Sequence, residues 1–185
     1  MKTSVKAGLL FALIWIIVIL IAFLTGRSID FFLISELLSL LLLLGAVFTG
    51  LFMTKREKNY EKSNALEDFK IAMQSGLVYT ILVTGFVYIY HNQIDTTIQE
   101  SFIAQRIDVL HEEFPDEASF IVYQAKDPKW KDLTYNDFIE NIEDQAKTFI
   151  GPFFTSFFHL MVFFMFSLFY SFFVTLVIRK IILRE

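Results

Sequence analysis

The sequence has no cysteine, only three prolines and seven glycines among 185 residues, and its charged residues amount to 19%. Without cysteine there is no disulfide framework, no thiolate metal site and no lipid-attachment cysteine. Few prolines and glycines leave little room for low-complexity linkers, and no internal repeat is visible. What the chain does have is 55% hydrophobic residues and a mean hydropathy of +0.54. Because a water-soluble domain of this length is less apolar, we expect a membrane protein.

Four apolar stretches are long enough to cross a bilayer, whose core of about 30 Å requires roughly 20 residues per helix. They cover residues 7–25, 31–53, 71–91 and 152–178. In residues 153–173 ten of 21 positions are phenylalanine, and a helix that is apolar on every side needs hydrocarbon around it. We predict an all-α polytopic membrane protein with a single membrane domain over residues 1–185 and an extracytoplasmic helical insertion at residues 92–150.

Basic residues gather in the N-terminal tail, the loop between the second and third spans, and the C-terminal tail. They are Lys2, Lys6, Lys55, Arg56, Lys58, Lys62, Lys70, Arg179, Lys180 and Arg184. Four spans place these segments on one side, and the positive-inside rule makes that side cytoplasmic. Residues 92–150 carry 13 Asp and Glu against 5 Lys and Arg, a net charge of −8, as expected for a periplasmic segment of a bacterial inner-membrane protein. Labelling of a C-terminal tag from outside the cell would contradict this orientation.

The first span follows Lys2 and Lys6, as in a signal peptide, but it is longer than a typical apolar signal region of 7–15 residues. No convincing cleavage site follows it. We therefore interpret it as a retained signal anchor.

Two amphipathic helices are predicted in the outer segment. The first, over residues 95–114, places these apolar side chains at helical spacing: Ile98, Phe102, Ile107, Leu110 and Phe114. The second begins near Thr134, an N-cap with Asp137 three residues on, and its apolar residues are Phe138, Ile139, Ile142, Ala146 and Phe149. At Gly151 and Pro152 it either stops and restarts as the fourth span or enters it with a kink.

Residues 118–132, between these helices, predict a short strand-like run followed by a turn, too small for a core of its own. The two helices are expected to pack on each other near the membrane surface. Trp130, Tyr123 and Tyr135 fit either an interfacial position or simple packing.

Two ionisable side chains stand out within the predicted spans, Glu36 and His159, because a charged group costs roughly 2.5–3.5 kcal/mol at mid-membrane. At about 1.5 Å per residue from the outer ends of their spans, Glu36 lies ~8 Å deep and His159 ~10 Å deep. A Glu36–His159 hydrogen bond, with Arg27 or Asp30 at the rim, would form a polar pocket for a ligand or a proton. In the alternative, each group finds a hydroxyl, a carbonyl or water, and the pair only holds two helices together.

Small residues predict where the helices pack. The third span has a stripe at four-residue spacing, Gly76, Thr80, Thr84 and Tyr88, which favours an interior position for this helix. Gly8 with Ala12, and Ala46 with Gly50, offer similar contact points on the first two spans. Ser156, Ser167 and Ser171 share one side of the fourth span and leave most phenylalanines for lipid or a partner.

Catalytic motifs are missing from the sequence. His111 begins HEEFP, in which Pro115 stands where a metalloprotease motif needs its second histidine. There is no nucleophile-elbow, phosphate-loop or dinucleotide fingerprint, and the acids Glu112, Glu113, Asp116 and Glu117 lack the spacing of a calcium loop. We expect no catalytic, cofactor-binding or metal residues, no cofactor and no nucleic-acid partner.

These patterns favour a non-enzymatic accessory or assembly subunit of a membrane complex. Its partners would be the lipid bilayer and either another membrane protein or a second copy, contacted through the phenylalanine-rich fourth span. The competing interpretation is a small transporter or ligand-binding membrane protein that uses Glu36 and His159, and an enzyme is the third.

The layout also carries a resemblance. A basic N-terminus, a charged loop with REKNY, the segment LEDFKIAMQSGLVYTILVTGFVYIYH and a last span ending in IRK resemble an uncharacterised family of four-helix Bacteroidota membrane proteins. That family is known as domain of unknown function number four-one-nine-nine. The resemblance covers nearly the whole chain and implies no activity, substrate or catalytic residue. Members tend to have small residues in the last span, whereas this chain has phenylalanine.

Overall fold

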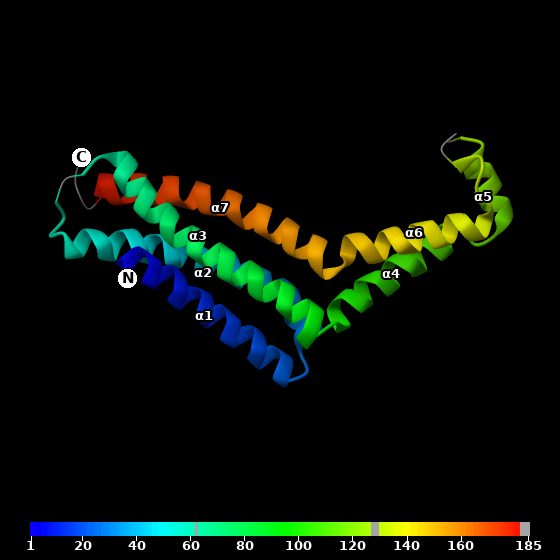
Figure 1. Ribbon diagram of the computed structural model, residues 1–185, viewed down its shortest axis with the longest axis horizontal. Helices are drawn as coiled ribbons and strands as arrows, with labels where there is room; N and C mark the ends of the chain where they lie inside the picture. The colour runs from blue at the N-terminus through cyan, green and yellow to red at the C-terminus, as the bar shows by residue number, and fades with distance from the viewer. Residues whose placement is uncertain (62, 127–129, 182–185) are drawn as a thin grey trace. The chain divides into compact units, whose positions relative to one another are not determined.

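The computed structural model describes residues 1–61, 63–126 and 130–181, which are mainly helical and contain no strand (Figure 1). In chain order the elements are α1 (Thr3–Leu24), α2 (Ser28–Glu57), α3 (Ala65–Ile89), the π-helical turn η1 (Tyr90–Ile94), α4 (Thr97–Glu113), α5 (Glu117–Gln124), α6 (Tyr135–Ile150) and α7 (Pro152–Ile181). Lys62 and Arg184, two of the basic residues used to predict the orientation, lie outside the described residues.

Four of these helices are long and apolar enough to cross a membrane: α1, α2, α3 with η1, and α7. The predicted all-α fold with four membrane-spanning helices is thus confirmed, and the helices run several residues past the predicted spans. The start of α1, the end of α2, the start of α3 and the end of α7 lie toward the same end of their bundle (Figure 1). An even number of crossings requires this arrangement, while the compartment and the orientation stay predictions from charge.

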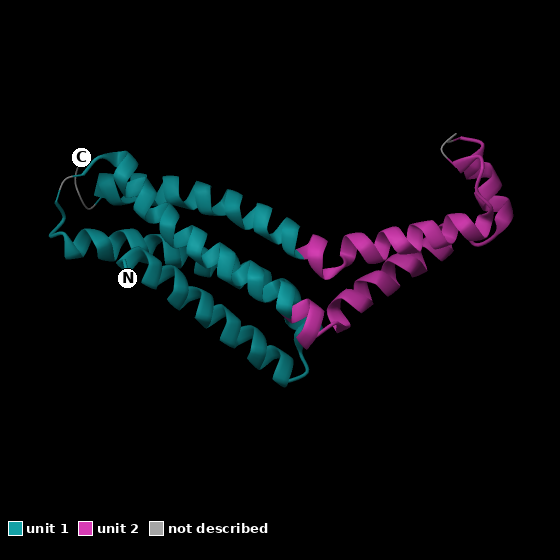
Figure 2. Ribbon diagram, viewed as in Figure 1, with its two compact units in different colours: residues 1–89, 156–185 teal, residues 90–155 magenta. Residues whose placement is uncertain are grey.

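The chain forms two compact units, shown in different colours in Figure 2. Unit 1 contains Met1–Ile89 and Ser156–Glu185, and therefore α1, α2, α3 and most of α7. Unit 2 contains Tyr90–Thr155, which is the predicted outer segment with a few residues added at each end.

Helices α1, α2 and α3 form the closely packed part of unit 1. Small residues let the backbones approach: a Cβ added at Gly8 would lie 2.5 Å from the backbone oxygen of Ser75. Two hydrogen bonds cross the same seams, since Ser75 donates to the Ser4 carbonyl at 2.6 Å and the Trp15 indole donates to the Ser35 carbonyl at 3.1 Å. Buried polar groups are thus satisfied where hydrocarbon would leave them without partners.

Helix α3 is the most buried of the four spans, as its stripe of small residues predicts. Gly76, Thr80 and Thr84 are buried, but Tyr88 at the end of the predicted stripe is 43% exposed. The stripe drifts around the helix because four residues exceed one turn of 3.6. The tyrosine of α3 that is buried is Tyr79, and its hydroxyl lies 2.9 Å from the Ser39 hydroxyl.

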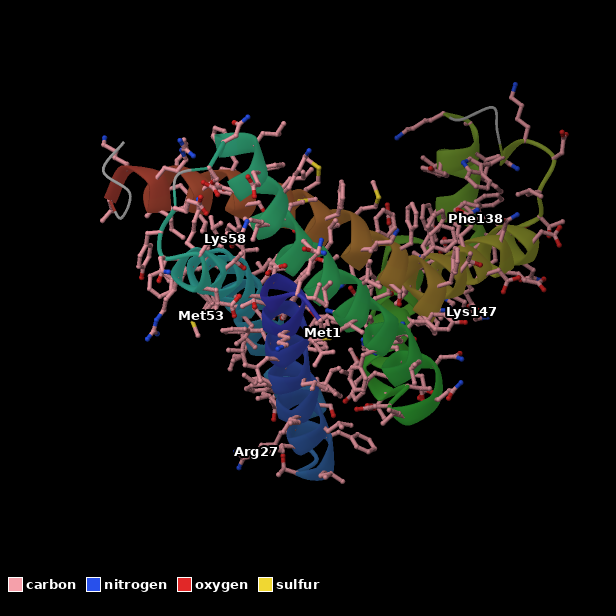
Figure 3. All side chains as sticks on the ribbon, turned by 60° about the vertical axis from the view of Figure 1, so that its left-hand side comes forward. Met1, Arg27, Met53, Lys58, Phe138 and Lys147 are labelled. Carbon is pink, nitrogen blue, oxygen red and sulfur yellow. The ribbon has the colours of Figure 1, made fainter. Side chains whose placement is uncertain are left out.

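Unit 2 has its own small aromatic core, to which the described part of residues 118–132 contributes only Phe120 and Trp130 among the buried residues. Its buried residues are Leu110, Phe114, Phe120, Trp130 and Phe138. Figure 3 shows Phe138 among the side chains of this cluster, and its ring centroid lies 4.6 Å from that of Phe120 and 5.3 Å from that of Trp130. Tyr123 and Tyr135 pack against the same cluster, so packing accounts for these aromatic residues.

The strand-like run predicted within residues 118–132 is wrong, because Glu117–Gln124 is helix α5; residues 127–129 lie outside the described part. Asp116 forms a capping box with Ser119, accepting from the Ser119 backbone N–H at 2.8 Å. This cap and the burial of Phe120 outweigh the strand preference of neighbouring β-branched residues.

The two predicted outer helices are present as α4 and α6. The Thr134 cap is confirmed, since its hydroxyl accepts from the Asp137 backbone N–H at 3.2 Å. Phe102 and Phe149, both predicted on apolar stripes, are 41% and 55% exposed. α6 ends at Ile150 and α7 restarts at Pro152, since Gly151 between them has an extended ψ of 161°.

Candidate functional site

Glu36 and His159 lie together in unit 1, on α2 and α7. The His159 Nε2 atom is 3.7 Å from the Glu36 Oε2 atom, a distance for an ion pair when the imidazole is protonated. The Glu36 side chain is 34% exposed and the His159 side chain 7%. Arg27 and Asp30 form no ion pair with this group among the residues that the structure describes. The pair thus combines an enclosed imidazole with a less enclosed carboxyl group.

Thr84 on α3 is the third member of the site. Its hydroxyl lies 3.0 Å from His159 Nδ1, so one ring nitrogen faces Thr84 and the other faces Glu36. Phe163, one turn further along α7, stacks on the imidazole with ring centroids 4.0 Å apart and an interplanar angle of 15°. Hydrogen bonding and stacking together fix the orientation of the ring.

This arrangement can hold one proton in two ways without changing its net charge. A carboxylate beside an imidazolium and a carboxylic acid beside a neutral imidazole are both neutral overall, and a neutral pair is tolerated better within a span than a single charge. Of the two groups, Glu36 is the less enclosed by the protein. The chemistry available here is therefore reversible proton binding or the binding of a small polar ligand.

Buried hydroxyls continue this polar surface along α3 and α7. Within the described part of the chain, the Thr80 and Ser156 hydroxyls are buried and have no hydrogen-bond partner. Gly76 and Thr84, on either side of Thr80 in the stripe, face α7 through Ser167 and His159. A buried hydroxyl without a partner costs free energy unless water or a ligand satisfies it.

The other predicted packing residues lie away from this site. Ala46 is fully buried in α2. A Cβ added at Gly50 would meet the side chain of Ser75 and the backbone of Ser4, so Gly50 lies where α1, α2 and α3 meet. Among the described residues, no group of three or more His, Cys, Asp or Glu side chains is arranged to hold a metal ion.

A buried ionic cluster at the end of the bundle was missed by sequence reasoning. Lys55 on α2 and Asp68 on α3 form an ion pair of 2.7 Å, with side chains only 2% and 0% exposed. Arg179 on α7 contacts the other carboxylate oxygen of Asp68 at 3.1 Å. Ser63 donates to Asp68 at 2.6 Å and also accepts from Lys55. We call these four residues the ionic cluster, and it joins three of the four spans.

A signal for this cluster did exist in the sequence. Lys55, Asp68 and Arg179 stand at the ends of the second, third and fourth spans, and four crossings bring these ends to one side. Lys55 and Arg179 were explained by the positive-inside rule alone, which assigns a side and no partner.

Comparison with known proteins found a match to one family model. The family model described as "Protein of unknown function (DUF4199)" matches residues 6–180, nearly the whole chain. No curated protein and no solved structure matches the sequence or the fold. With four helices suited to crossing a membrane and a family match over almost its full length, this chain belongs to the DUF4199 family of proteins of unknown function.

Proposed function

We propose that this protein is a non-enzymatic accessory subunit of a membrane complex, and that α7 is the helix by which it docks. The observation that carries the proposal is a difference between the uncovered surfaces of α1 and α7. The large exposed residues of α1 are aliphatic: Leu9, Leu10, Leu13, Ile14, Ile17, Ile21 and Leu24. The uncovered surface of α1 thus has no exposed aromatic residue.

The uncovered surface of α7 is mainly aromatic. We define the aromatic surface as Phe157, Phe158, Phe164, Phe166, Phe169 and Phe173, all of them exposed. Phe169 and Phe173 are stacked with nearly parallel rings, 8° between planes and 6.5 Å between centroids. Rigid rings lose little conformational entropy on binding, and each offers a large apolar area to a partner. This surface is therefore better suited to a protein partner than the surface of α1.

The expected partner is a membrane-spanning helix of another protein whose facing side carries Gly, Ala or Ser. Large rings form ridges, and helices in a membrane pack closely where ridges meet shallow grooves of small residues. Within the chain itself, α7 approaches α3 closely where both helices have small residues, Ser167 and Gly76. Between Pro152 and Ile178 α7 contains no Lys, Arg, Asp or Glu, so apolar contact dominates its surface.

Photo-crosslinking tests this proposal. With p-benzoylphenylalanine at Phe169, which is 61% exposed, we expect a discrete adduct with one membrane protein, mapped to a small-residue side of a spanning helix. The same group at Ile17 on α1, 56% exposed, is the matched control and should give lipid adducts only. The combined variant Phe166→Leu, Phe169→Leu and Phe173→Leu should lose the partner yet remain inserted.

Three results would count against docking through α7. They are equal adducts at both positions, adducts only between copies of this chain, and retention of the partner by the triple leucine variant. The second of these would show that the occupant is another copy of this protein.

The second candidate function is proton-linked transport or ligand binding at Glu36 and His159. The observation that favours it is the partly exposed carboxyl group 3.7 Å from a buried imidazole, beside the buried hydroxyls of Thr80 and Ser156. A carboxyl group and an imidazole that face each other can share a proton, which is the property that proton-linked transport needs.

Proton flux into proteoliposomes, followed with an enclosed pH-sensitive dye under an imposed pH gradient, tests the second candidate. Flux through the wild-type protein is expected to fall to background in Glu36→Gln and His159→Ala, because both variants remove a proton-binding atom. Glu67→Gln, at an exposed surface ion pair, is the control and should leave the flux unchanged. Variants that insert normally and conduct as the wild type does would show that the pair is structural.

A further inference from the structure

A groove runs between the start of α3 and the end of α7, within unit 1. Its volume is about 890 Å³. It is lined by Asn64, Ala65, Leu66 and Phe69 on the α3 side and by Phe172, Thr175, Leu176, Arg179 and Lys180 on the α7 side. Neither the Glu36–His159 site nor the proposed docking of α7 requires it.

The groove changes from apolar to basic along α7. Thr175 and Leu176 lie one turn before Arg179 and Lys180, a distance of about 6 Å along the helix axis at 1.5 Å per residue. The basic residues occupy the last turn of the helix, whereas Phe172 and Leu176 are 59% and 52% exposed and form the apolar wall. This polarity matches a molecule with an anionic head and a hydrocarbon tail.

The positive charge at the rim is held in place. The carboxylate of Asp68 fixes Arg179 at 3.1 Å, and the Arg179 guanidinium also donates to the Ser63 carbonyl at 2.8 Å. With all three groups ionised, Lys55, Asp68 and Arg179 together carry one net positive charge. Lys180 is exposed and adds a second, and no ion pair involves it within the described residues.

A buried donor is also available in the groove. Thr175 lines it and is only 4% exposed, and its hydroxyl has no hydrogen-bond partner in the described part of the protein. In a glycerophospholipid the ester carbonyls lie deeper in the membrane than the phosphate. A hydroxyl one turn below Arg179 is therefore at the level where an ester oxygen would accept its hydrogen bond.

From these features we infer that the groove between α3 and α7 binds an anionic phospholipid, with its phosphate group at Arg179 and Lys180, its ester region at Thr175 and one acyl chain along Phe172 and Leu176. Basic pockets between membrane-spanning helices commonly hold such headgroups on the positively charged side. A soluble anion would leave the apolar wall unused, and an apolar helix would offer no counter-charge to the exposed Lys180.

Brominated lipids test this inference, and the absence of native cysteine makes a single label possible. Leu66→Cys, in the groove wall, carries a fluorophore in the full-length protein reconstituted in phosphatidylcholine bilayers. Brominated phosphatidylglycerol should quench it at a lower mole fraction than brominated phosphatidylcholine. Lys180→Gln should reduce this preference about fivefold, the effect of one basic residue near a membrane surface, and Lys180→Arg should keep it. Thr175→Val should weaken quenching by both lipids.

Two controls separate a site from general attraction to a basic surface. Lys6→Gln removes a basic residue outside the groove and should leave the preference unchanged. A label at Leu37→Cys, 65% exposed on α2, should be quenched equally by both lipids. Equal quenching at the groove label, or an equal effect of Lys6→Gln and Lys180→Gln, would overturn the inference.

Discussion

Replacing Asp68 by alanine is expected to lower the free energy of unfolding by about 3–5 kcal/mol, the cost of leaving one partner of a buried ion pair alone. Lys55 would keep its charge inside the protein, with a side chain only 2% exposed, and would lose the carboxylate that it contacts at 2.7 Å. Arg179, which is 21% exposed, would lose one contact but can turn toward water. We therefore expect most of the loss to come from Lys55.

The measurement is an unfolding titration of the purified protein with sodium dodecyl sulfate in mixed micelles. Glu67→Gln is the matched control because Glu67 stands next to Asp68 in the first turn of α3 and pairs with Lys58 at 3.1 Å on an exposed surface. An exposed pair contributes about 0–1 kcal/mol, so this control should unfold close to the wild type. If both variants unfold alike, the ionic cluster does not stabilise the bundle.

A double variant distinguishes the contribution of the two charges to stability from the contribution of the volume that their side chains fill. Lys55→Met combined with Asp68→Leu removes both charges and keeps apolar volume between α2 and α3. Because replacing a whole buried pair is often neutral, the double variant should recover much of the stability lost in Asp68→Ala. Stability as low as that of Asp68→Ala would mean that the contacts of Ser63 and Arg179 to the carboxylate matter more than the charge on Lys55.

The four spans could be predicted because a helix suited to crossing a membrane is recognised from its own length and composition. In residues 153–173 length and apolar character decide the helix, and both are read directly from the sequence. The proximity of Glu36 and His159 could also be predicted from the sequence. Both helices start at the same membrane face, so counting residues gave similar depths, and the two side chains lie 3.7 Å apart.

Residues 118–132 show where local preference fails. Ile121 and Val122 favour a strand, but the Asp116–Ser119 capping box and the contact of Phe120 with Phe138 form helix α5. The capping residues were visible three positions apart in the sequence. The aromatic partner was not, because it lies 18 residues further along the chain.

The ionic cluster could not be predicted from local sequence patterns, for a different reason. Lys55, Asp68 and Arg179 come from three helices, and each has an adequate local explanation as a basic flank or as an acid in a first helical turn. Only the packing of α2, α3 and α7 reveals that these charges are buried against one another. Burial of a charge is thus the property that local patterns describe least well.

The seam between α1 and α3 leads to the second large effect, at Gly8. A Cβ there would lie 2.5 Å from the Ser75 backbone oxygen and 2.9 Å from the Val78 Cβ, and a backbone carbonyl cannot rotate away as a side chain can. Gly8→Ala must therefore separate the two helices and stretch the Ser75–Ser4 hydrogen bond. We expect a loss of about 1–3 kcal/mol from overpacking, and a larger loss in Gly8→Leu.

Gly85→Ala on α3 is the matched control, because a Cβ at Gly85 meets nothing within 4 Å. Alanine there favours the helix by about 1 kcal/mol relative to glycine, so this variant should be at least as stable as the wild type. The same titration in mixed micelles compares the variants. A Gly8→Ala protein as stable as Gly85→Ala would show that α1 and α3 approach less closely in the membrane than the structure has them. In that case close backbone packing would not be what holds α1, α2 and α3 together, and the polar contacts of Ser4, Ser75 and Trp15 would have to account for it.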